Sequence, residues 1–373
     1  MKNILVFVNS FNLGGITSLI QDIYRNLDRD KYSISFVRPD WNRNAFDEEV
    51  LANKDKVYYI QWEKLNRIPV INYITRRNNL VKKICKAVGK DKYDVAYIHA
   101  NAAYAVPAAK KLGIPKIIMH SHEAVSDFNS NENKSKITRF IWNRRVNMYN
   151  KFVDYKLGDS KKACIAKFGD GVVNDPNMMV VNPPINMQKF NPETYNAPEI
   201  EKEFGVKKDA FNMIHVGRLC AVKNQSFLLD VLKEMNQKTK TDLYIVGEGN
   251  PDKQQLIEYS KKLGVIDNVH FLAGNTTPGI YKLMKCSLLP SFSEAFGMTA
   301  VESQIMGVPC FASTNVPEDV DAGMCSFIDL SLGAKLWADK IFEYNYQGAK
   351  IDAEKIKGFD INNIIKTLEK IFD

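Results

Sequence analysis

Two cationic side chains follow closely on an apolar stretch near the middle of the sequence. Gly217 and Arg218 come directly after a predicted strand at 213–216, and Lys223 stands five residues beyond Arg218. An Arg and a Lys that flank a strand-to-helix turn can clamp a diphosphate, because both carry positive charge and several hydrogen-bond donors. A pair of surface cations is the alternative, but the position of Arg218 directly after the apolar run favours an anion site.

Two carboxylates separated by seven residues lie in the segment 290–302. Glu294 is expected in a loop, Gly297 permits close approach of the backbone to a ligand, and Glu302 falls on a predicted buried helix. Burying a carboxylate costs several kcal/mol unless it is hydrogen-bonded. A ligand rich in hydroxyl groups would supply such bonds.

A glycine pair lies near the N-terminus. Gly14 and Gly15 separate a predicted strand at 4–8 from a predicted helix. Glycines at this position let backbone N–H groups approach an anion, although such a pair often serves only to make a tight turn. The pair does not form the G-x-G-x-x-G dinucleotide fingerprint.

Two histidines, a serine and a glutamate form the run Met-His-Ser-His-Glu at 119–123, at the end of a predicted strand. A hydrolase would need a nucleophile elbow, which the sequence lacks, and a metal site would need third and fourth ligands, which the neighbouring sequence does not offer. Structural histidines are the alternative. Side chains at a strand's carboxyl end favour a functional position.

Strands and helices must alternate to place these motifs. Short β-branched runs are followed by amphipathic stretches throughout, which predicts parallel sheets with helices on both faces. The Pro- and Asn-rich segment 181–192 breaks the pattern and is predicted to link two Rossmann-like domains. The predicted strands lie at 4–8, 33–37, 57–60, 95–98, 116–119 and 155–157 before this segment, and at 213–216, 243–246, 269–272, 287–289, 308–311 and 326–328 after it.

The predicted domains are 1–185 and 186–356. A C-terminal helix at about 357–373 is expected to pack back on the first domain. Ligands bind beyond the carboxyl ends of the strands in such sheets, so we expect two facing domains to enclose a cleft.

Composition excludes several classes of protein. The 373 residues are 45% apolar and 25% charged, which excludes a disordered or fibrous chain. No signal peptide and no apolar run of membrane-spanning length are found, so a cytoplasmic protein with at most peripheral membrane contact is predicted. Six cysteines scattered without a C-x-x-C indicate reduced thiols rather than disulfides or a structural metal.

Charge divides the chain into a basic and an acidic part. The net charge is +12 up to Asp175 and −4 beyond it, which gives the total of +8. A basic half suits nucleic acid, an anionic membrane or a phosphorylated substrate. Because no recognised nucleic-acid-binding motif is present, we exclude nucleic acid as a partner.

The sequence resembles the retaining GT-B glycosyltransferases of family four. The resemblance rests on the E-x7-E spacing in S-F-S-E-A-F-G-M-T-A-V-E, the upstream G-R-L…K-N, the I-V-G-E-G at 245–249 and the N-terminal Gly pair, in order along nearly the whole chain. It implies an α/β fold of the GT-B type, with two Rossmann-like domains facing across a cleft. It also implies a retaining glycosyltransferase that moves a sugar from a nucleotide sugar to a glycan or lipid-linked acceptor, in the synthesis of a cell-surface or capsular polysaccharide.

The resemblance implies a role for individual residues. Arg218 and Lys223 would bind the diphosphate, Glu302 the ribose hydroxyls, and Glu294 the hydroxyls of the transferred sugar. The other donor-binding residues implied are Gly14, Gly15, Gly217, Glu248, Ala295, Phe296, Gly297 and Met298.

The resemblance further implies catalysis without a metal or cofactor. One histidine of the pair His120 and His122, with a preference for His122, would face the sugar and act with Glu294, Arg218 and Lys223. The two cations would stabilise the negative charge that develops on the diphosphate, most often that of a UDP-sugar. Retention would follow if the acceptor attacks the face that the diphosphate leaves.

The acceptor and the membrane involve the first domain. The helical segment 71–88 carries an apolar stripe of Ile71, Ile74, Val81, Ile84 and Val88 and a basic face of Arg76, Arg77, Lys82, Lys83 and Lys86. This face predicts peripheral docking on anionic lipid, where a lipid-diphosphate-linked acceptor would be reached; a solvated helix face is the alternative.

A nucleotide-sugar epimerase is the alternative enzyme, since the same two-domain fold also carries that chemistry. Such an enzyme needs acid and base groups in the cleft, and His120, His122 and Glu123 could supply them.

Overall fold

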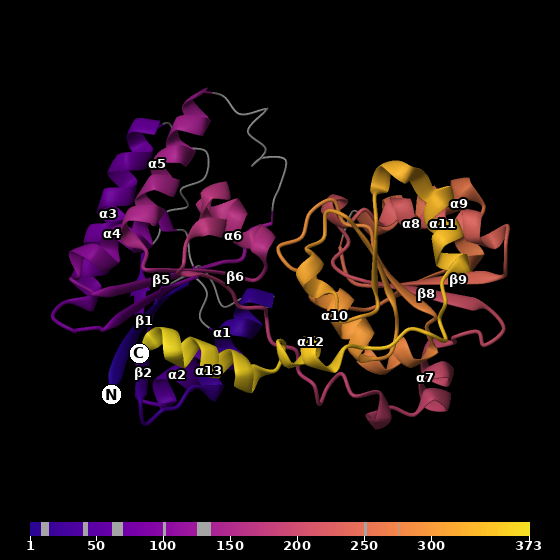
Figure 1. The fold of residues 1–373 in the computed structure, drawn as a ribbon, viewed down its shortest axis with the longest axis horizontal. Coiled ribbons are helices and arrows are strands. Elements are labelled where there is room, and N and C mark those ends of the chain that lie inside the picture. Colours follow the sequence, from indigo (N-terminus) through magenta and orange to yellow (C-terminus); the bar gives the residue numbers. More distant parts are fainter. Residues whose placement is uncertain are drawn as a thin grey trace. The chain divides into compact units, whose positions relative to one another are not determined.

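Strands and helices alternate along the chain as the sequence predicts (Figure 1). The computed structural model describes residues 1–8, 15–39, 44–61, 70–99, 102–124, 136–249, 252–274 and 276–373. Contacts divide the chain into unit 1, Met1–Pro184 with Ile361–Asp373, and unit 2, Ile185–Asp360. These boundaries lie one residue from the first expected domain boundary and about four from the second.

Unit 1 is built on a seven-stranded sheet in the order β3-β2-β1-β4-β5-β6-β7, and all neighbouring strands are parallel. Six of these strands match predicted runs to within two residues, whereas β7 was not predicted. The strands are β1 Lys2–Phe7, β2 Tyr32–Pro39, β3 Val57–Ile60, β4 Val95–Ile98, β5 Lys116–Ser121, β6 Tyr155–Gly158 and β7 Met178–Val180.

Helices cover both faces of this sheet, because successive strand side chains point to opposite sides. Leu5 and Phe7 pack with α3, α4, α5 and α6, whereas Ile4 and Val6 pack with α1, α2 and α13. The helices are α1 Gly15–Asn26, α2 Ala45–Ala52, α3 Val70–Val88, α4 Ala102–Lys111, α5 Lys136–Phe152, α6 Lys161–Phe168 and α13 Ile361–Phe372, with the 3₁₀ turn η1 at Asp170–Asn174.

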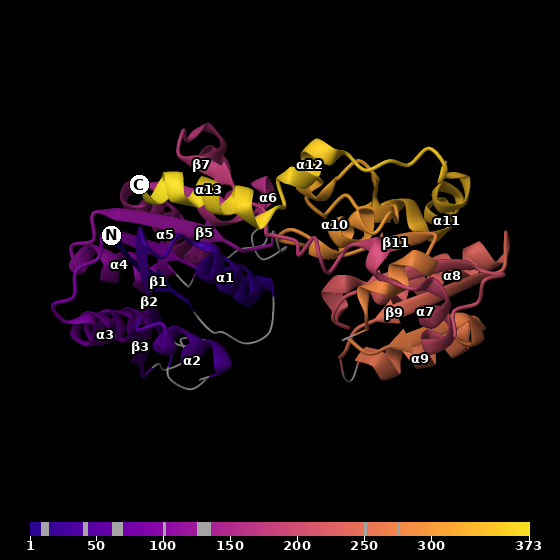
Figure 2. The same ribbon diagram turned by 90° about the horizontal axis from the view of Figure 1, so that it is seen from below.

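The last helix, α13, belongs to the core of unit 1 although it follows all of unit 2 in the sequence. Its buried residues Ile364, Leu368 and Phe372 join the cluster that contains Ile4 and Val6. Lys2 and Lys116 donate to backbone carbonyls in its last turn, at 3.1 and 2.9 Å, which satisfies groups that a helix end leaves unpaired. Both ribbon views show α13, in yellow, beside the strands of unit 1 (Figures 1 and 2).

Unit 2 is built on a six-stranded parallel sheet in the order β10-β9-β8-β11-β12-β13. All six strands match predicted runs to within two residues. The strand expected at 308–311 begins and ends two residues later, because Gly307 and Pro309 belong to the turn before it. The strands are β8 Phe211–Val216, β9 Thr241–Val246, β10 Val269–Leu272, β11 Cys286–Leu289, β12 Cys310–Ser313 and β13 Cys325–Ile328.

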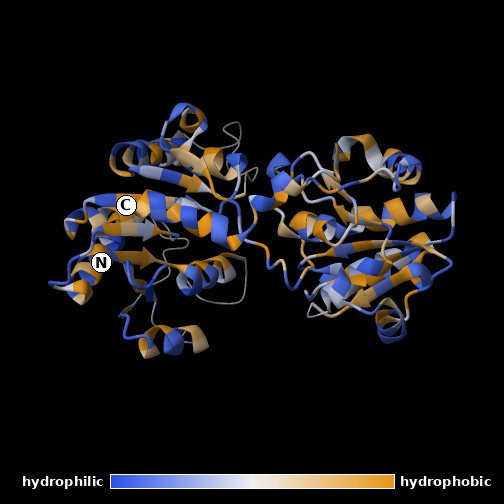
Figure 3. Cartoon of the chain, turned by 60° about the horizontal axis from the view of Figure 1, so that its bottom comes forward, coloured by the Kyte–Doolittle hydropathy of each residue, from blue (hydrophilic) through white to orange (hydrophobic). Residues whose placement is uncertain are grey.

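Two apolar clusters lie on the two faces of this sheet, and the covering helices carry both hydrophobic and hydrophilic residues (Figure 3). One face packs on α7 and α10, the other on α8, α9 and α11. The helices are α7 Ala197–Phe204, α8 Gln225–Asn236, α9 Asp252–Leu263, α10 Met298–Ile305, α11 Gly333–Glu343 and α12 Ala353–Lys357. The 3₁₀ turns are η2 Pro192–Thr194, η3 Ala221–Lys223, η4 Ile266–Asn268, η5 Pro278–Leu283, η6 Glu318–Val320 and η7 Leu330–Leu332.

Each sheet reverses its strand order at one point. In unit 1 the reversal falls between β1 and β4, and in unit 2 between β8 and β11. The loops that leave two adjacent strands there run to opposite faces of the sheet, and ligands of open α/β sheets bind in the crevice between them. The two topological switch points therefore indicate where each unit offers a site.

Helix α3 departs from its predicted stripe at one end. Val81, Ile84 and Val88 are buried as expected, but Ile74 is 49% exposed. The side chain of Ile71 lies outside the described part. Among the described residues, no helix is both long enough and apolar enough to cross a membrane.

We expect the exposed basic side chains of α3 to hold the protein on anionic vesicles, with about 1 kcal/mol from each cation near the surface. Vesicle co-sedimentation should be lost when the exposed Arg76, Lys82 and Lys83 and the half-buried Arg77 are reversed to Glu. High salt should also weaken binding of the unaltered protein.

The control carries the same charge change on exposed helix positions of unit 2. It reverses Lys233, Lys261, Lys262 and Lys335 to Glu. This variant should still bind anionic vesicles, and equal loss in both variants would show that net charge, rather than α3, is responsible.

Candidate functional site

An ion pair joins two loops at the switch point of unit 2. Lys223, after β8, lies with its Nζ 2.5 Å from Oε1 of Glu294, after β11. Ser291 Oγ donates to the same oxygen at 2.7 Å. The sequence assigned Lys223 and Glu294 separately, and the fold brings them together. Lys223 and Glu294 therefore neutralise each other's charge before any ligand binds.

The two loops are also joined through their backbones. Phe292 N donates to Val222 O at 2.9 Å, and Asn224 Nδ2 donates to Pro290 O at 3.2 Å. Asn224 adopts the left-handed conformation, with φ 55°, which Asn tolerates better than most residues. These bonds fix the turn that presents Lys223.

A buried histidine that the sequence analysis did not single out supports this turn. His215 Nδ1 donates to Leu288 O at 2.8 Å, and Gln225 Nε2 lies 3.3 Å from His215 Nε2 and donates to Arg218 O at 2.9 Å. Burial lowers the pKa of His215 to about 4, so the ring is neutral at pH 7. His215 and Gln225 therefore position the backbone of Arg218 rather than meet a ligand.

Arg218 differs from Lys223 in having an available side chain. It is exposed, and its guanidinium has no hydrogen-bond or ionic partner among the described residues. The methylene Cε of Lys223 lies 3.7 Å from the position that a Cβ would take at Gly217. Both cations thus belong to the same strand end, one engaged and one available for an anion.

Glycines allow the strand ends to approach each other closely. A Cβ on Gly247 would lie 2.0 Å from Gly217 O, and one on Gly249 would lie 2.2 Å from Leu219 O. The neighbouring Glu248 accepts a hydrogen bond from Leu219 N at its backbone oxygen, at 2.9 Å, and its side chain is exposed. The I-V-G-E-G segment therefore packs directly against the Arg218 turn.

Helix α10 begins at the loop that carries Glu294. Gly297, with φ 111°, precedes its first residue, Met298, and this backbone conformation is one that only glycine adopts readily. Phe296 is buried in the core and anchors the loop, while Ala295 and Met298 are half-buried. The loop is thereby held with its backbone at the switch-point edge.

Glu302, on α10, is a carboxylate without a hydrogen-bond partner among the described residues. The side chain keeps partial solvent access within a largely protein environment. Burial raises its pKa to about 7, and Lys189 offsets only part of this rise. A partly buried acceptor without a partner is destabilising unless a ligand completes its bonds.

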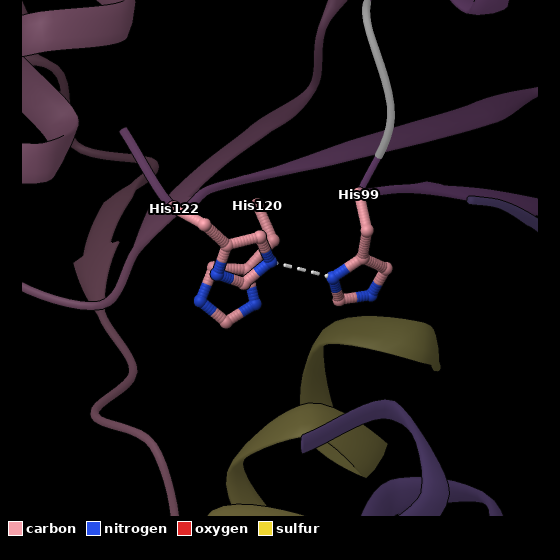
Figure 4. Close-up of side chains that lie close together, drawn as sticks. All are labelled: His99, His120 and His122. Carbon is pink, nitrogen blue, oxygen red and sulfur yellow. Dashed lines mark hydrogen bonds between the residues drawn. The ribbon is translucent and has the colours of Figure 1, made fainter. Parts of the chain in front are cut away.

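Three histidines meet at the carboxyl edge of the unit 1 sheet, next to its switch point (Figure 4), and Asp159 lies beside two of them. His99 follows β4, His120 lies near the end of β5, and Asp159 follows β6. His122 Nδ1 lies 2.8 Å from Asp159 Oδ2, and His122 Nε2 lies 2.8 Å from His99 Nδ1.

His120 is engaged differently from the other two histidines. Its Nδ1 lies 2.8 Å from Tyr97 Oη, and its Nε2 lies 3.2 Å from Asp159 Oδ1. Burial and the neighbouring His122 lower the pKa of His120, although Asp159 opposes this. Neither histidine of the His-Ser-His motif therefore presents a free ring nitrogen on a solvent-accessible surface.

Metal ligation is chemically possible at this cluster. One ring nitrogen of each histidine lies within 4.8 Å of those of the other two. The third ligand that the local sequence lacked is thus supplied by His99, from another strand. In the structure, however, two of these histidines are bonded to each other, which orients their ring nitrogens toward one another.

The remaining residues that the sequence singled out belong to unit 1. Gly15 begins α1, and Gly14 lies outside the described residues. Glu123, offered as an acid or base, pairs with Lys167. Sequence reasoning missed His99 and Asp159, although each follows a predicted strand by one or two residues, the same signal that singled out the histidines at 119–123.

Comparison with known proteins gives a consistent result. A family profile described as "Glycosyl transferases group 1" matches residues 196–318. The chain is 24% identical over 355 residues to the Bacillus subtilis protein EpsF, named as a glycosyltransferase, covering 91% of this chain and 87% of that one. It is 24% identical over 313 residues to an Escherichia coli enzyme named UDP-Gal:alpha-D-GlcNAc-diphosphoundecaprenol alpha-1,3-galactosyltransferase, covering 77% and 76% of the two chains.

Solved structures show the same fold. Anabaena HepE, in complex with UDP and glucose, aligns with a TM-score of 0.73 at 18% identity and 99% coverage of both chains. A glycosyltransferase from Rickettsia africae aligns with a TM-score of 0.76 at 16% identity, covering 100% of this chain and 97% of the other. The expected α/β fold with two Rossmann-like domains, GT-B, is confirmed.

Glu302→Gln should stabilise the protein in alkaline solution and weaken donor binding. The raised pKa means that the unfolded state releases its proton first, so stability is lost as pH rises from about 4.5 to about 7. The amide removes this cost, which is at most about 3 kcal/mol because the side chain keeps solvent access. Melting temperatures at pH 8 and pH 5 should show a gain at pH 8 that largely disappears at pH 5.

Glu258→Gln, at an exposed position of α9, is the matched control and should show no pH-dependent gain. Calorimetric titration with a nucleoside diphosphate should show weaker binding to the Glu302 variant alone. Unchanged affinity in a folded variant would remove Glu302 from the site.

Proposed function

We propose that this chain, which belongs to the group 1 glycosyltransferases, transfers a hexose from a UDP-sugar to a glycan or lipid-linked acceptor with retention of anomeric configuration. The observation that carries the proposal is the arrangement of charges at the β8–β11 switch point. An ion pair, Lys223 with Glu294, shares a strand end with Arg218, which is exposed and has no side-chain partner in the part of the chain that the structure describes. Such a site accepts a dianion without burying an uncompensated charge.

The ion pair gives the two charged residues separable tasks. When a diphosphate binds, the Lys223 ammonium can turn to it while keeping one donor for Glu294, and Arg218 adds a forked set of donors. Glu294 then has acceptor capacity for hydroxyls of the sugar. Breaking the sugar–phosphate bond places negative charge on the diphosphate, which these cations stabilise without large movement.

Glu302 suits the ribose of the nucleotide. A vicinal diol offers two hydroxyl donors, and Glu302 offers a carboxylate that lacks a protein partner among the described residues. A hydrogen bond to a charged acceptor contributes about 1.5–3 kcal/mol. Donor binding would therefore also favour the ionised form of Glu302 and lower its pKa.

The acceptor and the pathway are proposed from the relatives. HepE binds UDP, and the Escherichia coli relative is named for transfer to a sugar linked to diphosphoundecaprenol. A lipid-diphosphate acceptor would be reached by a peripheral protein, which the basic face of α3 supports. We propose a step in the synthesis of a cell-surface or capsular polysaccharide on the inner face of the membrane.

A panel of nucleotide sugars, screened in excess EDTA, tests the function. A ligand at 100 times its Kd adds about 2.7 kcal/mol to stability, which thermal melting detects. The sugar nucleotide that stabilises the protein should then be turned over, with EDTA present, onto a lipid-diphosphate acceptor, with retained configuration in the product.

Three results would contradict parts of this proposal. Activity abolished by EDTA and restored by manganese would defeat the metal-free mechanism. An inverted product would defeat retention. Conversion of one nucleotide sugar into another, without an acceptor, would identify the epimerase instead.

Arg218→Ala should lower kcat by a factor of about 100 or more with little change in melting temperature, because its side chain has no partner to lose among the residues that the structure describes. Lys223→Ala should lower kcat and also stability, since it leaves Glu294 unpaired. Lys233→Ala, at an exposed position of α8, is the control and should change neither. If Arg218→Ala unfolds the protein while the folded remainder keeps its rate, Arg218 is structural.

A further inference from the structure

We propose that His99 is the histidine of unit 1 that touches substrate, that its Nε2 accepts a hydrogen bond from a sugar hydroxyl, and that Asp159 and His122 position it. This assignment rests on the proposed glycosyl transfer and extends it to residues that the sequence analysis did not select. The three side chains form a continuous chain of hydrogen bonds in which each member fixes the next.

The chain starts from an ionised carboxylate. Asp159 is buried, and burial by itself would favour its protonated form, but His122 and His120 outweigh this effect and hold its pKa below the usual range. An ionised carboxylate only accepts hydrogen bonds. His122 Nδ1, 2.8 Å from Oδ2 and 2.9 Å from Oδ1, must therefore carry a proton.

The proton on His122 Nδ1 decides the state of His99. A His122 ring whose single proton lies on Nδ1 has a bare Nε2, which lies 2.8 Å from His99 Nδ1, and the two ring planes are within 7° of parallel. Only a protonated His99 Nδ1 can complete this bond. Burial, together with His122 and His120, lowers the pKa of His99 well below its usual value, so its Nε2 is bare.

The bare nitrogen of His99 is also the accessible one. His99 is 8% exposed. Its Nε2 has no hydrogen-bond partner among the described residues, and it is not one of the side-chain nitrogen and oxygen atoms that are both unpartnered and fully buried. Both ring nitrogens of His122 take part in the hydrogen-bond chain. His120 is 2% exposed, and its Nε2 is fully buried. The cluster therefore presents one lone pair, at His99, toward the carboxyl edge of β4.

A lone pair in a fixed direction requires a donor from the ligand. Sugar hydroxyls are donors, and either the transferred sugar or the acceptor sugar could supply one. Because the pKa of His99 is low, it is a weak base, and it serves to bind and orient the hydroxyl. Asp159 and His122 act through His99, in the manner of an aspartate that holds a histidine in one tautomer.

Nitrogen NMR of the free protein tests the hydrogen-bond chain without any substrate. With all five histidines labelled with ¹⁵N, we expect His99 and His122 to be protonated at Nδ1 and bare at Nε2, as the hydrogen-bond chain requires. Asp159→Asn places an amide donor at His122 Nδ1 and should reverse both tautomers. A His99 protonated at Nε2, an imidazolium, or metal-bound rings with stoichiometric metal in the purified protein would overturn the proposal.

Kinetics test the contact with substrate. His99→Phe, which keeps the ring shape and removes both nitrogens, should lower kcat/KM about 10- to 100-fold, and His99→Gln, which keeps an acceptor oxygen, should recover part of this loss. Asp159→Asn should show a similar loss. The double variant of Asp159→Asn and His99→Phe should be no worse than His99→Phe alone, because the two act through one atom.

Donor hydrolysis without an acceptor separates the two sources of the hydroxyl. If the hydroxyl belongs to the donor sugar, both hydrolysis and transfer fall in His99→Phe; if it belongs to the acceptor, only transfer falls.

The matched control is a second histidine–aspartate pair, at the amino edge of the unit 2 sheet, in which the aspartate is buried and the histidine is half-buried. Asp242 Oδ1 lies 3.2 Å from His270 Nε2, and Asp242→Asn should leave kcat/KM unchanged in the folded protein. If the unaltered protein turns over substrate and His99→Phe retains the same rate, the assignment of His99 is wrong. Absence of turnover in the unaltered protein would instead defeat the proposed function.

Discussion

Both candidate sites depend on one constraint, the parallel direction of the strands in each sheet. Parallel strands bring all their carboxyl ends to one edge, so residues far apart in the sequence meet there without being adjacent in the chain. Lys223 and Glu294 meet after β8 and β11, and His99 and Asp159 meet through His122 after β4, β5 and β6. A substitution that shifts the end of a strand would therefore change the arrangement of charged side chains in a site.

The two sites differ in how their charged and polar side chains are paired when no ligand is bound. In unit 2 the fold pairs Lys223 with Glu294 but leaves Arg218 and Glu302 without partners among the described residues. The unpartnered Glu302 therefore destabilises the folded protein, and ligand binding can offset this destabilisation. Such a loss of stability is expected at functional sites. In unit 1 every histidine is held by a neighbour, so the cluster is ordered before any ligand arrives.

Support beneath each site is as important as the residues that face the ligand. His215 and Gln225 hold the backbone of Arg218, and Asp159 sets the hydrogen positions of two histidines. Such buried polar networks lose much of their effect when one member is removed, since the others are then left unsatisfied. Stability and activity should therefore be coupled at these positions.

The sequence by itself determined the fold class and nearly all strands, and it singled out the motif residues of unit 2 as candidates, because apolar periodicity and strand-end position are local properties. It also indicated that the C-terminal helix returns to the first domain. It could not show that Lys223 pairs with Glu294, that Ile74 is exposed, or that His99 and Asp159 complete the cluster around His122. Those facts depend on which strands are neighbours in the sheet, an order that only the tertiary structure decides, because strand pairing joins residues that no local pattern connects.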